Sequence, residues 1–147
     1  MLIVDDTIAN VLLLKVLIGN QKYRIVTAGN GMEALQAVEK ESPDLILLDI
    51  MMPGMNGYEV AEKLKADPQT QEIPIIFLTA LNSTNDIVKG FKTGASDYIS
   101  KPFNKEELLI RVTHQISLIA AKRLIASQMK ELHDDYYHNF LKNKKVK

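Results

Sequence analysis

Leu45-Ile46-Leu47-Leu48-Asp49 is a run of four apolar residues that ends on a carboxylate. Four further short runs of similar character accompany it along the chain: Leu2-Ile3-Val4, Tyr23-Arg24-Ile25-Val26-Thr27, Ile75-Ile76-Phe77-Leu78 and Tyr98-Ile99. Three of these runs are almost wholly apolar, which is typical of strands buried on both faces of a parallel sheet. The sequence therefore predicts five strands in one buried sheet.

Amphipathic stretches with recognisable ends separate these runs. Asn30 can cap a helix from about Gly31 to Glu41, which Ser42-Pro43 stops. Similar patterns predict a helix from Gly57 to Ala66 closed by Asp67-Pro68, one from Ser83 or Thr84 to Gly94, and one that begins at Asn104 with Glu107 completing a capping box.

Alternation of strands and helices predicts an α/β fold. We expect a doubly wound, five-stranded parallel sheet of order 2-1-3-4-5 with five helices and right-handed crossovers, followed by a C-terminal helical extension. In such sheets, ligands bind outside the carboxyl ends of the strands.

The size and composition of the chain limit what it can be. Its 147 residues suit one domain with a short addition, and 46% hydrophobic with 24% charged residues is typical of a globular protein. The absence of cysteine excludes disulfides, thiolate zinc sites and a cysteine nucleophile. No apolar run approaches the roughly 18 residues of a membrane span. Since the start of the chain also reaches acidic residues at once, we expect a cytoplasmic protein without membrane contact.

Charge divides the chain into two parts. Residues 1–118 carry 11 Lys and Arg against 15 Asp and Glu, a net charge of −4, whereas residues 119–147 carry 7 against 3, a net charge of +4. An acidic body argues against direct DNA binding. We therefore expect a main domain at 1–118 and a helical extension or signalling linker at 119–147, whose basic end from Lys142 to Lys147 is expected to fray.

The extension carries one apolar seam. Its residues recur at steps of three and four, an 11-residue repeat of about 3.67 residues per turn: Leu118, Ala121, Ile125, Met129, Leu132, Tyr136 and Phe140. The helix could fold back on its own domain. We favour pairing with a second copy, because the domain already has enough cover and leaves the seam nothing local to bury against.

Polar side chains collect at the predicted strand ends. Asp5 and Asp6 follow the first strand, Asp49 ends the third, Thr79 ends the fourth and Lys101 follows the fifth. Two unit charges about 5 Å apart repel by about 3 kcal/mol at an effective dielectric constant of about 20. We therefore expect a bound cation to compensate the three carboxylates, and a ligand set of oxygens alone favours Mg²⁺.

The motifs at these strand ends together resemble the receiver domain of two-component response regulators, a family with a flavodoxin-like fold that includes the chemotaxis regulators. The resemblance covers about residues 1–118. It rests on four segments in order: Val4-Asp5-Asp6, Leu48 to Gly57 (LDIMMPGMNG), Leu78-Thr79-Ala80, and Gly94 to Phe103 (GASDYISKPF).

The resemblance implies a phosphorelay switch that histidine kinases or phosphotransfer proteins phosphorylate on Asp49. It implies that Asp6 and Asp49 bind Mg²⁺ directly, Asp5 through water, and Met51 through its backbone carbonyl. Lys101 would bind a phosphoryl oxygen, with Pro102 holding the preceding bond cis.

The resemblance also implies a conformational response. Thr79 would bind another phosphoryl oxygen, and Tyr98 would turn inward as Thr79 moves, switching the face formed by the fourth helix, fifth strand and fifth helix. Met51 and Leu81, which are apolar and lie at the rim, predict a long-lived acyl phosphate. We expect self-catalysed phosphorylation and dephosphorylation only, with no separate substrate.

Other interpretations remain open at this stage. A Mg²⁺-dependent aspartyl-phosphate phosphatase or a pseudo-receiver that works by interaction alone would share some residues. Gly29-Asn30-Gly31-Met32-Glu33-Ala34 fits a dinucleotide-binding fingerprint, but it follows the second strand rather than the first. The chain could be a stand-alone receiver with a helical tail or a fragment of a longer regulator. We favour the fragment, in which a histidine kinase or a cyclic-dinucleotide enzyme could be the output.

Overall fold

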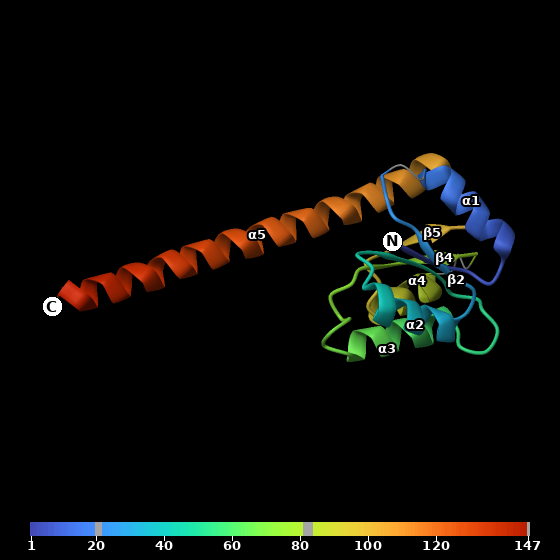
Figure 1. Cartoon of the computed structure of the whole chain (residues 1–147). Helices are drawn as coiled ribbons and strands as arrows, with labels where there is room; N and C mark the ends of the chain where they lie inside the picture. The colour runs from blue at the N-terminus through green and yellow to red at the C-terminus, as the bar shows by residue number, and fades with distance from the viewer. Residues whose placement is uncertain (20–21, 81–83, 147) are drawn as a thin grey trace. The chain divides into compact units, whose positions relative to one another are not determined.

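The computed structural model describes residues 1–19, 22–80 and 84–146, and side chains in the last range from 85 to 143. Within these ranges, five strands form one parallel sheet of order β2-β1-β3-β4-β5 (Figure 1). The strands are β1 (Leu2–Val4), β2 (Val26–Ala28), β3 (Ile46–Asp49), β4 (Ile75–Thr79) and β5 (Asp97–Ser100). The predicted fold and strand order are confirmed.

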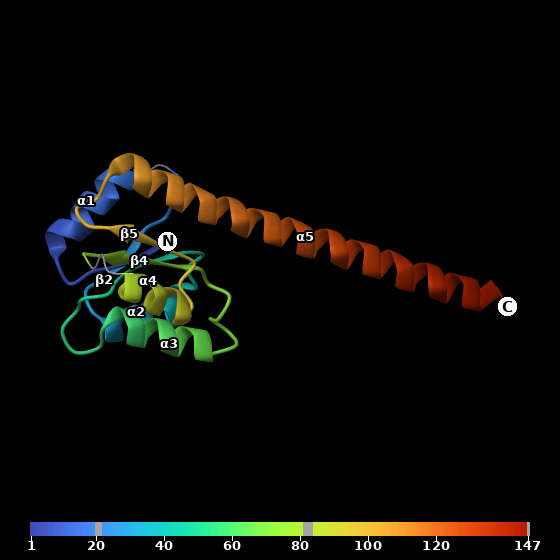
Figure 2. The same ribbon diagram turned by 180° about the vertical axis from the view of Figure 1, so that it is seen from behind.

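Helices cover both faces of the sheet. The helices are α1 (Ile8–Ile18), α2 (Gly31–Glu41), α3 (Gly57–Ala66), α4 (Thr84–Lys92) and α5 (Lys105–Val146). Helices α2, α3 and α4 lie on one face, and α1 lies on the other with the first turns of α5 (Figures 1 and 2). Because helices cover both faces, all residues of β1, β3 and β4 are buried.

Asparagine side chains begin three of the helices. The Asn30 Oδ1 atom accepts from the Glu33 N–H at 2.8 Å, and the Asn104 Oδ1 atom accepts from the Glu107 N–H at 3.0 Å. Asn56 caps α3 in the same way, a role that the sequence did not single out. The predicted bounds of α2 and α3 match the structure. Helix α4 begins at Thr84, while the alternative start at Ser83 lies outside the described residues.

The predicted bounds of the second strand are wrong. The sequence predicts a strand over residues 23–27, but β2 covers Val26–Ala28. The cause is the length of its neighbour, because β2 is an edge strand that pairs only with β1. The strand pairs with the three residues of β1, with Val26, Thr27 and Ala28 in register with Leu2, Ile3 and Val4. Just before it, the Met1 amino group donates to the Arg24 carbonyl at 2.9 Å.

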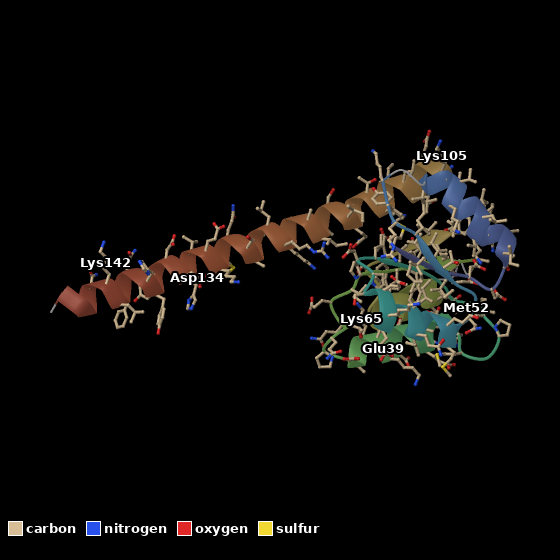
Figure 3. All side chains as sticks on the ribbon, viewed as in Figure 1. Glu39, Met52, Lys65, Lys105, Asp134 and Lys142 are labelled. Atoms are coloured by element: carbon tan, nitrogen blue, oxygen red, sulfur yellow. The ribbon has the colours of Figure 1, made fainter. Side chains whose placement is uncertain are left out.

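The chain divides into two compact units, Met1–Gln115 and Ile116–Lys147, and α5 runs through the boundary. In the second unit, every side chain described from Ala120 to Asn143 is exposed. Figure 3 shows side chains projecting above and below the helix around Asp134 and Lys142. The side chains of residues 144–147, which include most of the basic end, lie outside the described part. Among the described helices, none has the length and apolar character needed to span a membrane.

Candidate functional site

Three carboxylates come together at the carboxyl ends of β1 and β3. These strands are neighbours in the sheet, with Val4 in register with Leu48, so the residues that follow them lie side by side. Each of Asp5, Asp6 and Asp49 offers an oxygen within 4.8 Å of the others. Asp5 and Asp49 are only 2% exposed, whereas Asp6 is exposed. The cluster is therefore a buried acidic pocket with one carboxylate at its rim.

Lys101 brings a cation to this pocket from the end of β5. Its Nζ atom lies 3.0 Å from Asp49 Oδ1 and 3.3 Å from Asp5 Oδ2. Burial lowers the pKa of Lys101, but bonding to Asp49 and the charges of both carboxylates outweigh burial and raise it. The Lys101-Pro102 peptide bond is cis, as expected. Lys101 thus stays charged and bridges two of the three carboxylates.

The Asp49 carboxylate is under electrostatic strain. Burial raises the pKa of Asp49 to about 6 and the charge of Asp5 adds to the rise, while Lys101 and the Met51 N–H, which donates to Asp49 Oδ1 at 3.3 Å, oppose it. Three carboxylates against one ammonium leave a net negative charge in the pocket. A set of oxygen donors with excess negative charge fits a hard divalent cation such as Mg²⁺.

Hydrogen bonds from two residues that follow it in sequence hold the Asp5 carboxylate in place. Its Oδ1 atom accepts from the Thr7 N–H at 2.9 Å, and its Oδ2 atom accepts from the Asn10 side-chain amide at 3.3 Å. Asn10 was not predicted as a site residue. Its signal was available, because Asn10 and Lys15 are the only strongly polar residues of the helix IANVLLLKVLI.

Gly57 allows the start of α3 to approach the end of β3. A Cβ atom at Gly57 would lie 2.4 Å from the Asp49 carbonyl oxygen and 2.8 Å from Ile50 Cα. The Gly57 N–H donates to the Ile50 carbonyl at 2.9 Å. The absence of a side chain therefore lets the backbone bond form and fixes the loop beside Asp49.

The model of the response regulator receiver domain family matches residues 1–113 of the chain. The chain belongs to this family.

Relatives support this assignment over the same region. The receiver is 45% identical over 111 residues to response regulator PleD of Caulobacter vibrioides, covering 76% of this chain but 24% of PleD. It is 43% identical over 111 residues to the DNA-binding response regulator MtrA of Mycobacterium tuberculosis, covering 76% of this chain and 47% of MtrA. The chain thus spans about a quarter to a half of these relatives.

Solved structures agree on the fold. Chemotaxis protein CheY4 of Vibrio cholerae is 33% identical, with a TM-score of 0.72 over 77% of this chain and 94% of that one. A CheY-like receiver domain protein from Methanospirillum hungatei is 30% identical, with a TM-score of 0.75 over 82% and 95% of the two chains.

The other predicted residues of the receiver lie on β4 and β5. Thr79 is 4% exposed at the end of β4, and its carbonyl accepts from the Lys101 N–H at 2.8 Å. Tyr98 in β5 is half-buried and contacts Phe91 and Arg111. Sequence reasoning missed both contacts, since pairs on separate elements depend on how each helix is rotated.

Two sequence expectations concern the rim and the glycine turn. Met51 is 63% exposed, while Leu81 lies outside the described residues. In the turn that resembles a dinucleotide fingerprint, the Glu33 side chain takes the place that a ligand would occupy at the Gly29 amide. The Gly29 N–H donates to Glu33 Oε2 at 2.8 Å. A Cβ atom at Gly31 would meet Met55 Cβ at 2.8 Å, so this glycine serves helix packing.

Proposed function

We propose that the receiver accepts a phosphoryl group on Asp49 from the phosphohistidine of a histidine kinase or phosphotransfer protein. An Asp49 carboxylate oxygen attacks phosphorus in line, the new O–P bond forms, and the N–P bond breaks as the imidazole leaves with its electron pair. The observation that carries this proposal is the buried Asp49 carboxylate, bonded to Lys101 at 3.0 Å within a cluster of three carboxylates.

The surrounding side chains have separate roles in this proposal. Lys101 provides a compact positive charge for a phosphoryl oxygen, and the Thr79 hydroxyl donates to another. Asp6 and Asp49 would bind Mg²⁺ directly, with Asp5 acting through water and Met51 through its carbonyl. When bound, the ion offsets charge on the phosphoryl oxygens.

Phosphorylation then acts as a switch. Thr79 shifts toward the phosphoryl group, Tyr98 turns inward after it, and the face of α4, β5 and α5 changes for the next partner. In this proposal the chain is a cytoplasmic regulator that converts no separate substrate and does not itself bind DNA. Its receiver covers residues 1–118, followed by the extension at 119–147.

We also propose that the extension forms a homodimer. Its seam exposes large apolar side chains, with Leu118, Ile125, Met129, Leu132, Tyr136 and Phe140 between 41% and 73% exposed. Such a continuous apolar stripe on a helix is the kind of surface that a second helix covers.

Intact mass after incubation with acetyl phosphate tests the phosphorylation proposal. We expect the wild type to gain one phosphoryl group only with Mg²⁺, and Asp49→Asn to gain none. Asp134→Asn is the matched control, because Asp134 is an exposed aspartate of the extension, and it should behave as the wild type. A folded wild type that gains nothing would instead indicate a pseudo-receiver.

A further inference from the structure

The ring of Tyr98 in β5 lies between two side chains from different helices. Phe91 of α4 meets it edge to face, with ring centroids 6.0 Å apart and an angle of 82° between planes. The guanidinium carbon of Arg111 in α5 lies 5.1 Å from the centroid of the Tyr98 ring. Both contacts are favourable, so the present position of Tyr98 is actively stabilised.

Arg111 is itself anchored on both sides. Its Nη1 atom donates to Asp97 Oδ1, and its Nε atom donates to Glu107 Oε1 at 3.3 Å, one turn earlier in α5. Asp97 Oδ1 also accepts from the Tyr98 N–H at 2.9 Å. The planar guanidinium can form these ion pairs and contact the ring at once, which an ammonium does less well. Arg111 therefore connects α5 to β5 at Tyr98.

An apolar cavity lies beside the same ring. It is small and partly open to solvent, it is bordered by β4, α4 and β5, and its lining includes Ile50, Phe77, Thr79, Ile87, Gly90 and Tyr98. Thr79 and Tyr98, the two proposed switch residues, thus face one space. A Tyr98 ring that leaves Arg111 therefore lies beside a small apolar cavity that Thr79 also lines.

We propose that Arg111 is a positioning residue that holds the Tyr98 ring out of this cavity and releases it when Asp49 is phosphorylated. The inference rests on the proposed function, since it concerns the residue that opposes the Tyr98 movement. Because Arg111 belongs to α5, release of the ring also removes a contact between β5 and α5.

Fluorine NMR of the full chain labelled with 3-fluorotyrosine tests this inference. Tyr98→Phe assigns the Tyr98 resonance, and acetyl phosphate with Mg²⁺ defines its phosphorylated position in the wild type. In unphosphorylated Arg111→Gln we expect the Tyr98 resonance to move toward that position. Loss of the cation–π contact and the ion pairs should raise the population of the phosphorylated-state ring position by about five- to tenfold. Arg111→Lys, which keeps the charge, should shift it less.

The matched control is Arg24→Gln. Arg24 is also an ion-paired arginine, with its Nη2 atom 2.9 Å from Glu41 Oε2, and it should leave the Tyr98 resonance unchanged. Asp97→Asn, which removes one of the two anchors of Arg111, should move the resonance in the same direction as Arg111→Gln. An unchanged Tyr58 resonance shows that each variant is folded.

Two outcomes separate this inference from the proposed function. A Tyr98 resonance that is the same in Arg111→Gln, Asp97→Asn and the wild type overturns the positioning role. If both variants move the resonance but acetyl phosphate does not move it in the wild type, the positioning role stands and the phosphorylation-driven movement of Tyr98 fails.

Discussion

Replacing Asp49 with asparagine should stabilise the fold at neutral pH when divalent cations are removed. Burial and Asp5 raise the pKa of Asp49 from 3.8 to about 6, so ionisation of this carboxylate is costly in the folded protein. The folded state binds the proton more tightly than the unfolded state does. Stability therefore falls as pH rises from about 4 to about 6, and the loss is complete above that range.

The size of the effect follows from the pKa difference. A rise of about two units at 1.36 kcal/mol per unit corresponds to about 3 kcal/mol of destabilisation above pH 6. Asparagine keeps the shape of the side chain without the charge. It also deprives Lys101 of its 3.0 Å partner, but Asp5 remains 3.3 Å from the same ammonium. We therefore expect Asp49→Asn to gain about 2 kcal/mol at pH 8 and almost nothing near pH 4.

Urea unfolding in EDTA at several pH values between 4 and 8 measures this difference. Asp134→Asn serves as control, since Asp134 is exposed and should give the wild-type free energy of unfolding at every pH. Adding Mg²⁺ at pH 8 should stabilise the wild type more than Asp49→Asn, because the proposed ion site exists in the native state only and uses the Asp49 carboxylate. Equal stability of Asp49→Asn and wild type at pH 8, or a gain that does not change with pH, would refute this account of the pocket.

Three further predictions concern packing, assembly and turnover. Gly57→Ala places a Cβ atom 2.4 Å from the Asp49 carbonyl oxygen and should cost about 1–3 kcal/mol in urea unfolding, whereas Gly29→Ala, with its nearest atom at 3.4 Å, should change little. The wild type should be a dimer by light scattering at high micromolar concentration, and Ile125→Glu should be a monomer. If both proteins are monomers, dimerisation through the apolar seam of the extension is wrong. Met51→Asn should hasten decay of the acyl phosphate, because an amide at the rim can orient water, and an unchanged decay rate would count against that role.

Much of the sheet could be predicted because burial on both faces leaves a strong sequence pattern. Ile75–Leu78 and Leu45–Leu48 mark β4 and β3 to within one residue at each end. The start of β2 could not be predicted in this way, because it depends on the three-residue length of β1 rather than on its own composition. The extent of an edge strand depends on the partner it pairs with, and its own sequence does not contain that information.

The residues of the site also differ in whether local sequence or distant packing determines their positions. Asp5 and Asp49 could be placed together because Asp5 follows β1 and Asp49 ends β3, and the strand order makes these two strands neighbours. The contact of Arg111 with Tyr98 depends instead on the rotation of α5 against β5, which a helical pattern of several exposed and buried residues does not fix. Sequence therefore locates the pocket, while contacts between separate elements, such as that of Arg111 with Tyr98, emerge only from the packed structure.

The net charge of the pocket predicts that a divalent cation binds before the phosphoryl donor. The carboxylates of Asp5, Asp6 and Asp49 and the ammonium of Lys101 leave a net charge of −2 when all are ionised. A phosphoryl donor is itself anionic, and at about 5 Å two unit charges repel by about 3 kcal/mol at an effective dielectric constant of about 20. In the proposed reaction, a pocket of charge −2 repels the anionic donor before the Asp49 carboxylate reaches phosphorus, whereas a pocket neutralised by one divalent cation does not. The rate of labelling should therefore reach its plateau at a lower concentration of Mg²⁺ than of acetyl phosphate. Labelling at the full rate in EDTA would contradict the idea that the cation binds before the donor.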